Sequence, residues 1–393
     1  MSKEAIICVQ LDYVRDFHCD GKFCDAQCCQ KWRIEIDRDT YKKYKKIKDP
    51  KWRKRICENI HRSKKTGRWE IALDEAEKCP FLGDDLLCVI QRNLGEEYLS
   101  QVCASYPRQT YRFRKFMECS LTMSCPLALK LAMRNDRPLG LEQILLAPGN
   151  MHIIDRCGSD AMNRYIIDLQ LLTIPILQQR VITIGQRLQL LGLVIEIVEP
   201  YVKKGQDIPV ADIEAAIAAC DYEGLKSVND LGQVLSLFNR LVEEGLEKIS
   251  LDGHNYVADV IDALDLQDGE LRVSQLLDKY LEQERFYQEC VEKPYAQMIE
   301  NFVVNTWFAG CYPMKIEEDI GNNYRMFSLF MQLTKLYLLA IAVKKKESLK
   351  QMDILALLER MAVLFEHSRR YIEIGWEFVN SKVEGYENMD SQE

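Results

Sequence analysis

Proline and glycine are scarce in this chain, at 11 and 19 of 393 residues. Because both residues form the tight turns of short hairpins, their scarcity argues against an all-β protein and favours long helices. A composition of 47% hydrophobic and 28% charged residues is ordinary for a soluble globular protein and excludes a disordered or collagen-like chain. We therefore expect a mainly α fold.

The sequence also lacks targeting and membrane-spanning patterns. The N-terminal residues contain no basic region followed by an apolar run of signal-peptide length, and no small-residue cleavage site. The longest apolar stretch lies between Lys335 and Lys344, far short of the roughly 20 residues that a membrane span needs. We therefore expect a cytoplasmic protein without a membrane partner. Thiols stay reduced in that compartment, so clustered cysteines indicate metal binding or catalysis rather than disulfides.

Charge and cysteine content divide the chain into two parts. Residues 1–130 carry 26 Lys and Arg against 19 Asp and Glu, whereas residues 131–393 carry 26 against 41. Of the 15 cysteines, 11 lie in the first 125 residues, where helical periodicity is weak. We therefore expect an irregular cysteine-rich metal-cluster domain over residues 1–130, followed by an all-helical substrate- or partner-binding domain over residues 131–393.

Helical periodicity locates several elements. In the first domain it predicts one or two basic amphipathic helices within residues 40–68. In the second domain it predicts helices over 229–249, 270–288, 295–308, 323–345 and 353–378. Breaks in the helical pattern are expected at Pro175, Gly185, Pro200 and Gly205.

The basic stretch could attract nucleic acid or an acidic protein, because residues 38–68 hold 14 Lys and Arg with interleaved aromatic residues. A solvated helix face explains the same pattern. Since the acidic second part of the chain offsets the basic charge, nucleic acid is not favoured as a partner.

Eight cysteines of the first domain are candidate metal ligands: Cys19, Cys24, Cys28, Cys29, Cys79, Cys88, Cys103 and Cys125. Four thiolates complete either a tetrahedral zinc site or an iron–sulfur cluster. Zinc sites normally use paired Cys-x2-Cys knuckles, which are absent here, so we favour an iron–sulfur cluster with zinc as the alternative. Adjacent side chains point apart in most backbone conformations, so Cys28 and Cys29 are not both expected to bind one metal.

The residues around these cysteines resemble the flagellin lysine-N-methylases. The similar blocks are residues 17–19, 24–37, 79–82 (Cys-Pro-Phe-Leu), 87–91, 94–100 and 103–108 (Cys-Ala-Ser-Tyr-Pro-Arg). Weaker blocks at 121–126, 300–305 and 368–369 extend the resemblance to nearly the full length. The cysteine-rich part alone also resembles the broader class of zinc- or iron-chelating cysteine-cluster proteins.

The resemblance implies an enzyme that transfers methyl groups from S-adenosylmethionine to lysine ε-amines of flagellin or a similar protein, using a cysteine-bound iron–sulfur cluster. The alternative is a non-enzymatic zinc or iron–sulfur protein that binds a partner or transfers electrons. The later blocks, which contain Asn301, Asn305 and Arg369, favour the enzyme. The chain has no glycine-rich cofactor loop after a strand; the nearest candidate, residues 192–197, holds one glycine within helical sequence.

A lysine methylase needs a group near the substrate that can take a proton from an ammonium with an ordinary pKa of about 10.4. The family-like blocks offer Asp25, Glu35, Asp37, Glu96, Glu97, Tyr98 and Tyr106, and the sequence does not select the catalytic residue among them. Two further roles follow from the same blocks. Arg108 could pair with the carboxylate of the cofactor, or with a protein acid, and Tyr106 could shield the cluster from water.

Overall fold

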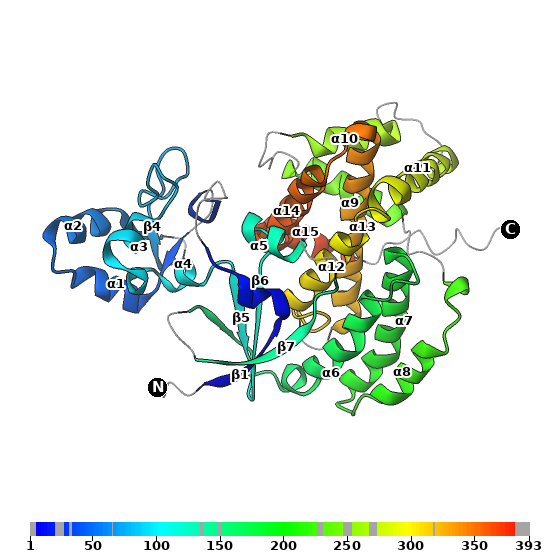
Figure 1. The fold of residues 1–393 in the computed structure, drawn as a ribbon, viewed down its shortest axis with the longest axis horizontal. Coiled ribbons are helices and arrows are strands. Elements are labelled where there is room, and N and C mark those ends of the chain that lie inside the picture. Colours follow the sequence, from blue (N-terminus) through cyan, green and yellow to red (C-terminus); the bar gives the residue numbers. More distant parts are fainter. Residues whose placement is uncertain are drawn as a thin grey trace. The chain divides into compact units, whose positions relative to one another are not determined.

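The computed structural model describes residues 5–19, 27–30, 34–64, 66–133, 137–147, 151–225, 231–246, 254–266, 273–316 and 319–381. The chain divides into two compact units. The first comprises Met1–Leu131 and Gly140–Gly158, and the second comprises Ala132–Leu139 and Ser159–Glu393. Figure 1 labels the elements of both units.

A five-stranded sheet in the first unit has the strand order β7-β1-β6-β5-β8. Its strands are β1 (Ile6–Leu11), β5 (Arg108–Arg112), β6 (Met117–Leu121), β7 (Leu141–Leu146) and β8 (Ile153–Asp155). β1 runs parallel to β6 and antiparallel to β7, while β5 runs antiparallel to β6 and parallel to β8. All residues of the central strand β6 are buried, as in a strand covered on both faces.

The strands β7 and β8 correct the expectation that residues 131–393 are all helical. The sequence of β7, Leu-Glu-Gln-Ile-Leu-Leu, consists largely of good helix formers. β7 is nevertheless a strand, because it pairs with β1 along its whole length, from Ile6 opposite Leu146 to Leu11 opposite Leu141. Tertiary pairing therefore overrides local propensity here.

The cysteine-rich part lies between β1 and β5. Its elements are the 3-10 helices η1 (Asp12–Asp16), η2 (Gln27–Cys29) and η3 (Glu96–Tyr98), the strands β2 (Glu35–Ile36), β3 (Ile60–Arg62) and β4 (Trp69–Ile71), and the helices α1 (Arg38–Lys45), α2 (Pro50–Glu58), α3 (Val89–Leu94) and α4 (Gln101–Ser105). β2, β4 and β3 form a small antiparallel sheet. The hydrophobic core of the cysteine-rich part includes the buried side chains of Ile34, Tyr44, Ile56 and Phe81.

The prediction of one or two basic helices within residues 40–68 is confirmed, since the structure has two, α1 and α2, the first of which begins at Arg38. The side chain of Asp37 caps α1 by accepting from the Thr40 amide at 2.9 Å. Asp49 caps α2 in the same way, and Pro50 occupies the first turn, where its missing amide hydrogen is tolerated. The lysines and arginines lie on the outer faces of both helices, while Tyr44 and Ile56 point into the core.

All the regular elements in the described part of the second unit are helices, and the mainly α prediction is confirmed. After α5 (Pro126–Met133), the helices are α6 (Asp160–Leu177), α7 (Ile184–Lys203), α8 (Val210–Ala218), the 3-10 helix η4 (Tyr222–Gly224), α9 (Leu231–Glu243), α10 (Tyr256–Leu264), α11 (Val273–Tyr287), the π-helix η7 (Gln288–Glu292), α12 (Ala296–Ala309), α13 (Ile320–Lys345), the 3-10 helix η8 (Lys346–Ser348), α14 (Gln351–His367) and α15 (Arg369–Asn380).

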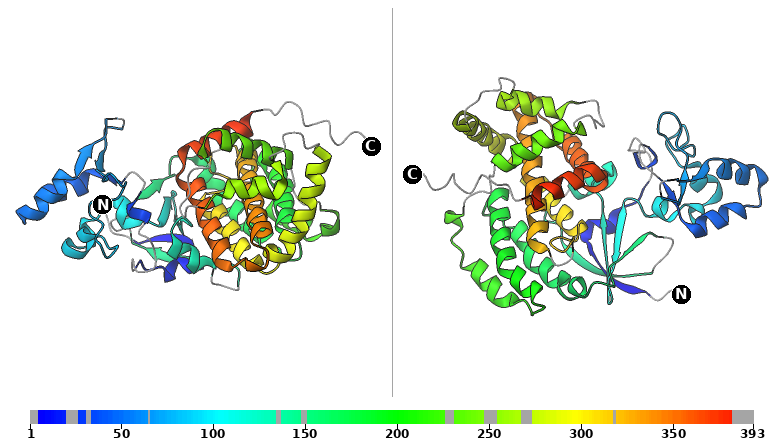
Figure 2. Two further views of the ribbon diagram at one scale, coloured as in Figure 1. Left: turned by 90° about the horizontal axis from the view of Figure 1, so that it is seen from above. Right: turned by 180° about the vertical axis from the view of Figure 1, so that it is seen from behind.

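The long helix α13 forms the centre of this unit. It contacts α7, α9, α10, α11, α14 and α15, and these helices surround it in Figures 1 and 2. Among the described residues, the segment Ile320–Ser348 is the one helix long and apolar enough to cross a membrane. Because 83% of its most apolar window is buried inside the protein, it has the character of a core helix.

The predicted helices of the second unit exist, but three breaks differ. Pro175 and Pro200 lie inside α6 and α7 rather than between helices. Each proline lies in the last turn of its helix, so its missing amide hydrogen and its ring disturb the end of the helix and do not divide it. Conversely, the helix predicted over 353–378 is divided at Ser368, whose side chain caps α15 by accepting from the Tyr371 amide at 3.4 Å.

Candidate functional site

A cavity of about 620 Å³ in the first unit brings most of the candidate cysteines together. The described cysteines that line it are Cys19, Cys28, Cys29, Cys79, Cys88, Cys103 and Cys125. Cys24 lies outside the described residues. Thiols spread along the sequence from residue 19 to residue 125 thus meet around one space.

Short backbone contacts position these thiols. The Cys79 amide donates to the Cys29 carbonyl at 2.8 Å, which joins two segments that are distant in the sequence. Cys88 is the N-cap residue of α3 and forms an isolated bridge with Leu82. Cys103 lies in α4, and its amide donates to the side chain of the cap residue Ser100 at 3.2 Å. Hydrogen bonds of the backbone therefore hold the segments that carry these thiols, in a part of the chain with little regular structure.

The adjacent pair Cys28 and Cys29 corrects the sequence prediction that their side chains point apart. Both line the cavity, and their sulfur atoms are 3.9 Å apart. A hydrogen bond joins the two sulfurs, and either sulfur can be the donor. This contact lowers the pKa of Cys28 and raises that of Cys29. The pair therefore presents two adjacent sulfur atoms to the cavity.

Two of the other thiols, those of Cys79 and Cys103, are harder to ionise than a free cysteine. Burial raises the pKa of Cys79 to about 11, and the neighbouring Cys88 and Cys28 add to the shift. Burial also raises the pKa of Cys103 to about 12, with further contributions from Cys88, Cys79 and Cys28. These mutual effects show that the thiols lie within electrostatic reach of one another. A cation bound among them would displace their protons.

The donor set suits a thiolate-bound metal centre by its chemistry, because soft thiolate ligands select zinc and iron–sulfur clusters. Among the described residues, no three His, Cys, Asp or Glu side chains already surround a single metal position. Binding would therefore require the sulfurs to turn toward a common point, which is the usual coupling of metal binding to folding.

Tyr44 is a residue of the site that the sequence prediction missed. Its side chain is 1% exposed, belongs to the core of the cysteine-rich part and lines the cavity. Burial raises the pKa of its hydroxyl, and Cys103 and Cys88 raise it further. Tyr44 therefore keeps its proton and can donate a hydrogen bond to a sulfur. In the sequence, Tyr44 is distinguished only by its helical spacing from other apolar residues of the basic stretch, and the same spacing is typical of an ordinary core residue.

Two of the seven acid and tyrosine candidates line the cavity, namely Glu96 and Tyr106. Glu35 forms an ion pair with Arg68 at 3.0 Å, and Asp37 is used as the cap of α1. Asp25 lies outside the described residues, and Glu97 and Tyr98 do not line the cavity. The geometry therefore separates candidates that the sequence left equivalent.

Arg108 and Tyr106 both line the cavity, as their proposed roles at the cofactor require. The Arg108 guanidinium donates to the Phe17 carbonyl at 2.9 Å and lies over the Phe17 ring, 5.0 Å from its centroid. The Tyr106 hydroxyl is 3.4 Å from the Ser124 hydroxyl oxygen. The Phe17 contacts hold the guanidinium at the cavity while leaving donors for a second partner.

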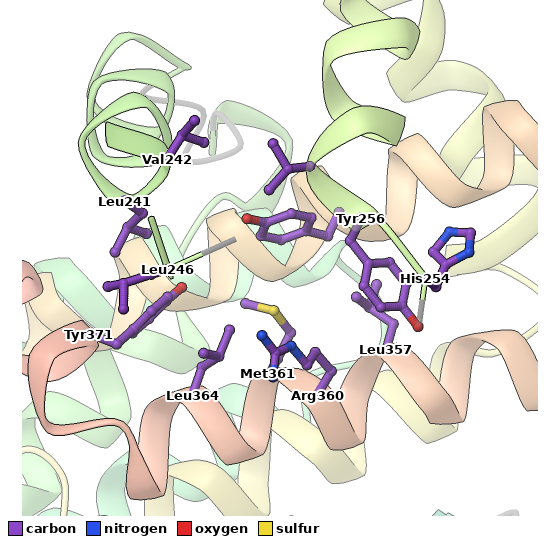
Figure 3. A pocket seen from close by; sticks show the side chains of 12 residues that line it. Leu241, Val242, Leu246, His254, Tyr256, Leu357, Arg360, Met361, Leu364 and Tyr371 are labelled. Carbon is purple, nitrogen blue, oxygen red and sulfur yellow. The ribbon is translucent and has the colours of Figure 1, made fainter. Parts of the chain in front are cut away.

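The helical unit contains a small cavity between its helices. A cavity of about 20 Å³ lies between α9, α10, α13, α14 and α15, lined mostly by apolar side chains together with His254, Arg360 and Tyr371 (Figure 3). This volume is about that of one water molecule. It therefore cannot hold a cofactor.

The glycine considered as a cofactor loop has a packing role instead. Gly192 lies within α7, and a Cβ at this position would be 2.6 Å from the hydroxyl oxygen of Tyr324 in α13. That hydroxyl donates to the Leu188 carbonyl at 2.7 Å. Gly192 therefore allows the close approach of two helices, and its position within α7 agrees with the helical sequence expected there.

The later family-like blocks also have structural roles. Asn301 and Asn305 are fully buried in α12, and the Asn301 side chain donates to the Ala132 carbonyl at 2.9 Å. Arg369 is exposed and pairs with Glu373 at 2.6 Å. None of the three lines the cysteine cavity.

Comparison with known proteins gives a consistent set of relatives. Residues 170–391 match the FliB lysine N-methylase C-terminal domain. A segment of 117 residues is 38% identical to the flagellar biosynthetic protein FliU of Salmonella muenchen, covering 29% of this chain and 69% of that protein. Lysine-N-methylases of Salmonella choleraesuis and Salmonella typhimurium show 38% identity over 117 residues, which cover 29% of each enzyme's length. No solved structure matches the chain.

Proposed function

Since this chain belongs to the FliB lysine N-methylase family, we propose that it transfers methyl groups from S-adenosylmethionine to lysine ε-amines of flagellin or a similar protein. The observation that carries the proposal is the cavity of the first unit, where the candidate cysteines meet Tyr106 and Arg108. Its volume of about 620 Å³ lies within the roughly 300–1,000 Å³ of small-molecule sites.

The proposed metal centre is an iron–sulfur cluster held by cysteines of the cavity. The five thiols that influence one another's ionisation are the first candidates as ligands: Cys28, Cys29, Cys79, Cys88 and Cys103. Such a cluster would supply an iron able to accept the amino and carboxylate groups of S-adenosylmethionine. Cys19 and Cys125 line the same space and are the remaining described candidates.

The protein's own side chains have three tasks in this proposal. The Arg108 guanidinium, which is charged at all physiological pH values, pairs with the cofactor carboxylate. Tyr44 and Phe81, each 1% exposed, exclude water from the sulfur atoms. Tyr106 lines the same cavity as Arg108 and can orient the cofactor through its hydroxyl.

The test begins with protein purified without oxygen. We expect a brown protein that contains iron and sulfide, binds S-adenosylmethionine and methylates lysines of purified flagellin, as detected by mass spectrometry. A colourless protein that carries stoichiometric zinc and has no affinity for S-adenosylmethionine would refute the proposal and support the non-enzymatic alternative.

Ligand removal tests the assignment of the thiols. Cys79→Ser and Cys103→Ser should lose most of the bound iron, because each removes a thiol that lines the cavity. Cys220→Ser is the matched control, since Cys220 follows α8 in the second unit and is also partly buried. Equal iron content in the three variants would show that the ligand assignment is wrong.

A further inference from the structure

The charges around the cysteine cavity are asymmetric. Among the described lining residues, Glu96 carries the single carboxylate, while Arg92 and Arg108 are cationic. Arg92 is paired with Asp85, so its charge is largely compensated. Glu96 is exposed and has no ion pair with any other described residue. The cavity therefore presents one free acidic group at its solvent-exposed side.

The backbone fixes the position of this carboxylate. Gly95 ends α3 and has a φ of 99°, in the region that favours glycine, so the chain turns sharply before Glu96. After the turn, the Leu99 amide donates to the Glu96 carbonyl at 2.9 Å, and the buried Leu99 anchors the segment in the core. Lys43 donates to the next carbonyl, that of Glu97, at 3.2 Å. The turn places Glu96 at the cavity, whereas Glu97 does not line it.

We infer that Glu96 binds the ε-ammonium of the substrate lysine at the mouth of the cavity. This inference rests on the proposed function and identifies the residue that recognises its substrate. A lysine ammonium is a compact cation with three donors, and a carboxylate is its natural acceptor. The aliphatic stem of the lysine can lie against Leu86, Leu87 and Leu127, which line the same cavity. Arg108, on the same cavity, would repel the ammonium, so Glu96 decides where the lysine binds.

The test compares two neighbouring acids that differ in their relation to the cavity. Glu96→Gln removes the charge and keeps the shape of the side chain, and Glu97→Gln is the matched control. With purified unmethylated flagellin, we expect Glu96→Gln to raise KM about five- to tenfold, the effect of losing one charge-assisted hydrogen bond at a partly exposed site. The iron content and the affinity for S-adenosylmethionine should stay near those of the wild type. Glu97→Gln should stay within about twofold in all three measurements.

Salt dependence gives a second measurement. The wild-type KM for flagellin should rise with ionic strength, and Glu96→Gln should weaken this dependence, because screening acts on the ion pair that the variant lacks. A Glu96→Gln enzyme with wild-type KM and salt dependence would overturn the inference while leaving the methylase proposal intact. A wild-type protein that methylates no flagellin lysine would overturn both.

Discussion

The buried ion network around Glu300 makes a quantitative prediction about the helical unit. The Glu300 side chain is 1% exposed and accepts from Arg187 at 2.8 Å, and the Arg187 side chain is 6% exposed. Arg180 donates to the same carboxylate at 3.0 Å but is 48% exposed. Breaking a buried pair costs about 3–5 kcal/mol because it leaves an unpaired charge, whereas an exposed pair contributes at most about 1 kcal/mol.

Glu300→Ala should therefore act mainly through Arg187. Arg187 keeps its hydrogen bonds to the carbonyls of Leu177 at 2.9 Å and Ile182 at 3.1 Å, which partly satisfy the guanidinium. We expect a loss near the lower end of the range, about 3 kcal/mol in the free energy of unfolding of this unit. Glu373→Ala is the matched control, because Glu373 is 42% exposed in its pair with Arg369 and should cost less than about 0.5 kcal/mol.

The assay is hydrogen exchange of the buried helix α12 at increasing urea concentrations. Unfolding followed by a signal from the whole protein would combine the contributions of both units. Hydrogen exchange of peptides from Ala296–Ala309 reports only the unit that contains Glu300. Glu300→Gln removes the charge of the side chain and keeps its shape. If the unpaired charge of Arg187 causes the loss, Glu300→Gln should lower the free energy of unfolding by about as much as Glu300→Ala does. A Glu300→Ala protein within about 1 kcal/mol of the control would refute the reasoning.

Two further predictions concern packing and pH. Gly192→Ala should destabilise the protein by about 1–3 kcal/mol despite a better helix propensity, because its Cβ would lie 2.6 Å from the Tyr324 hydroxyl oxygen. Gly224→Ala in the same unit, where the nearest atom to the new Cβ is the Asp221 Oδ2 at 3.8 Å, should be close to neutral in the same urea titration, and equal effects would contradict the packing argument. Burial raises the pKa of the Cys8 thiol from 9.0 to about 12, and the nearby Cys119 and Glu118 add to this shift. The protonated Cys8 thiol therefore makes its full contribution to stability below about pH 9, and this contribution is lost as the pH rises toward 12. At about pH 9, iodoacetamide should modify the half-buried Cys57 of folded protein but leave Cys8 unmodified until urea is added, and equal labelling detected by mass spectrometry would show that Cys8 is accessible.

The helices were the most predictable part of the fold. α12 and α13 follow from long apolar stretches, and the caps at Asp37 and Asp49 follow from residue type and position. The strand β7 could not be predicted, because its register with β1 involves a partner more than a hundred residues away and its sequence favours a helix. Pro175 was predicted to interrupt the helical pattern, but it lies in the last turn of α6, where a proline marks the end of a helix and does not divide it.

The site was predictable to the extent that its chemistry depends on residue type. Cysteines are rare and reactive, so their clustering in the sequence pointed to one centre, and seven of the eight candidates line one cavity. Tyr44 and Glu96 belong to common residue types, and only their placement distinguishes them from Tyr98 and Glu97. No local pattern encodes that placement, because it depends on the turn at Gly95 and on the packing of α1 against the cysteine segments.

The construction of the cysteine-rich part argues that its proposed centre is also structural. Its helices and strands are short, and the core between them contains twelve buried residues in the described part of the chain, one of which is itself the candidate ligand Cys79. A core of this size rarely stabilises a fold without a metal or a covalent link. Burial raises the pKa of Cys79 and Cys103, which favours their protonated forms when no metal is bound. A bound centre would replace those protons and join η2, α3 and α4 through their sulfurs, so the same cysteines that hold the proposed cofactor site would hold the fold around it.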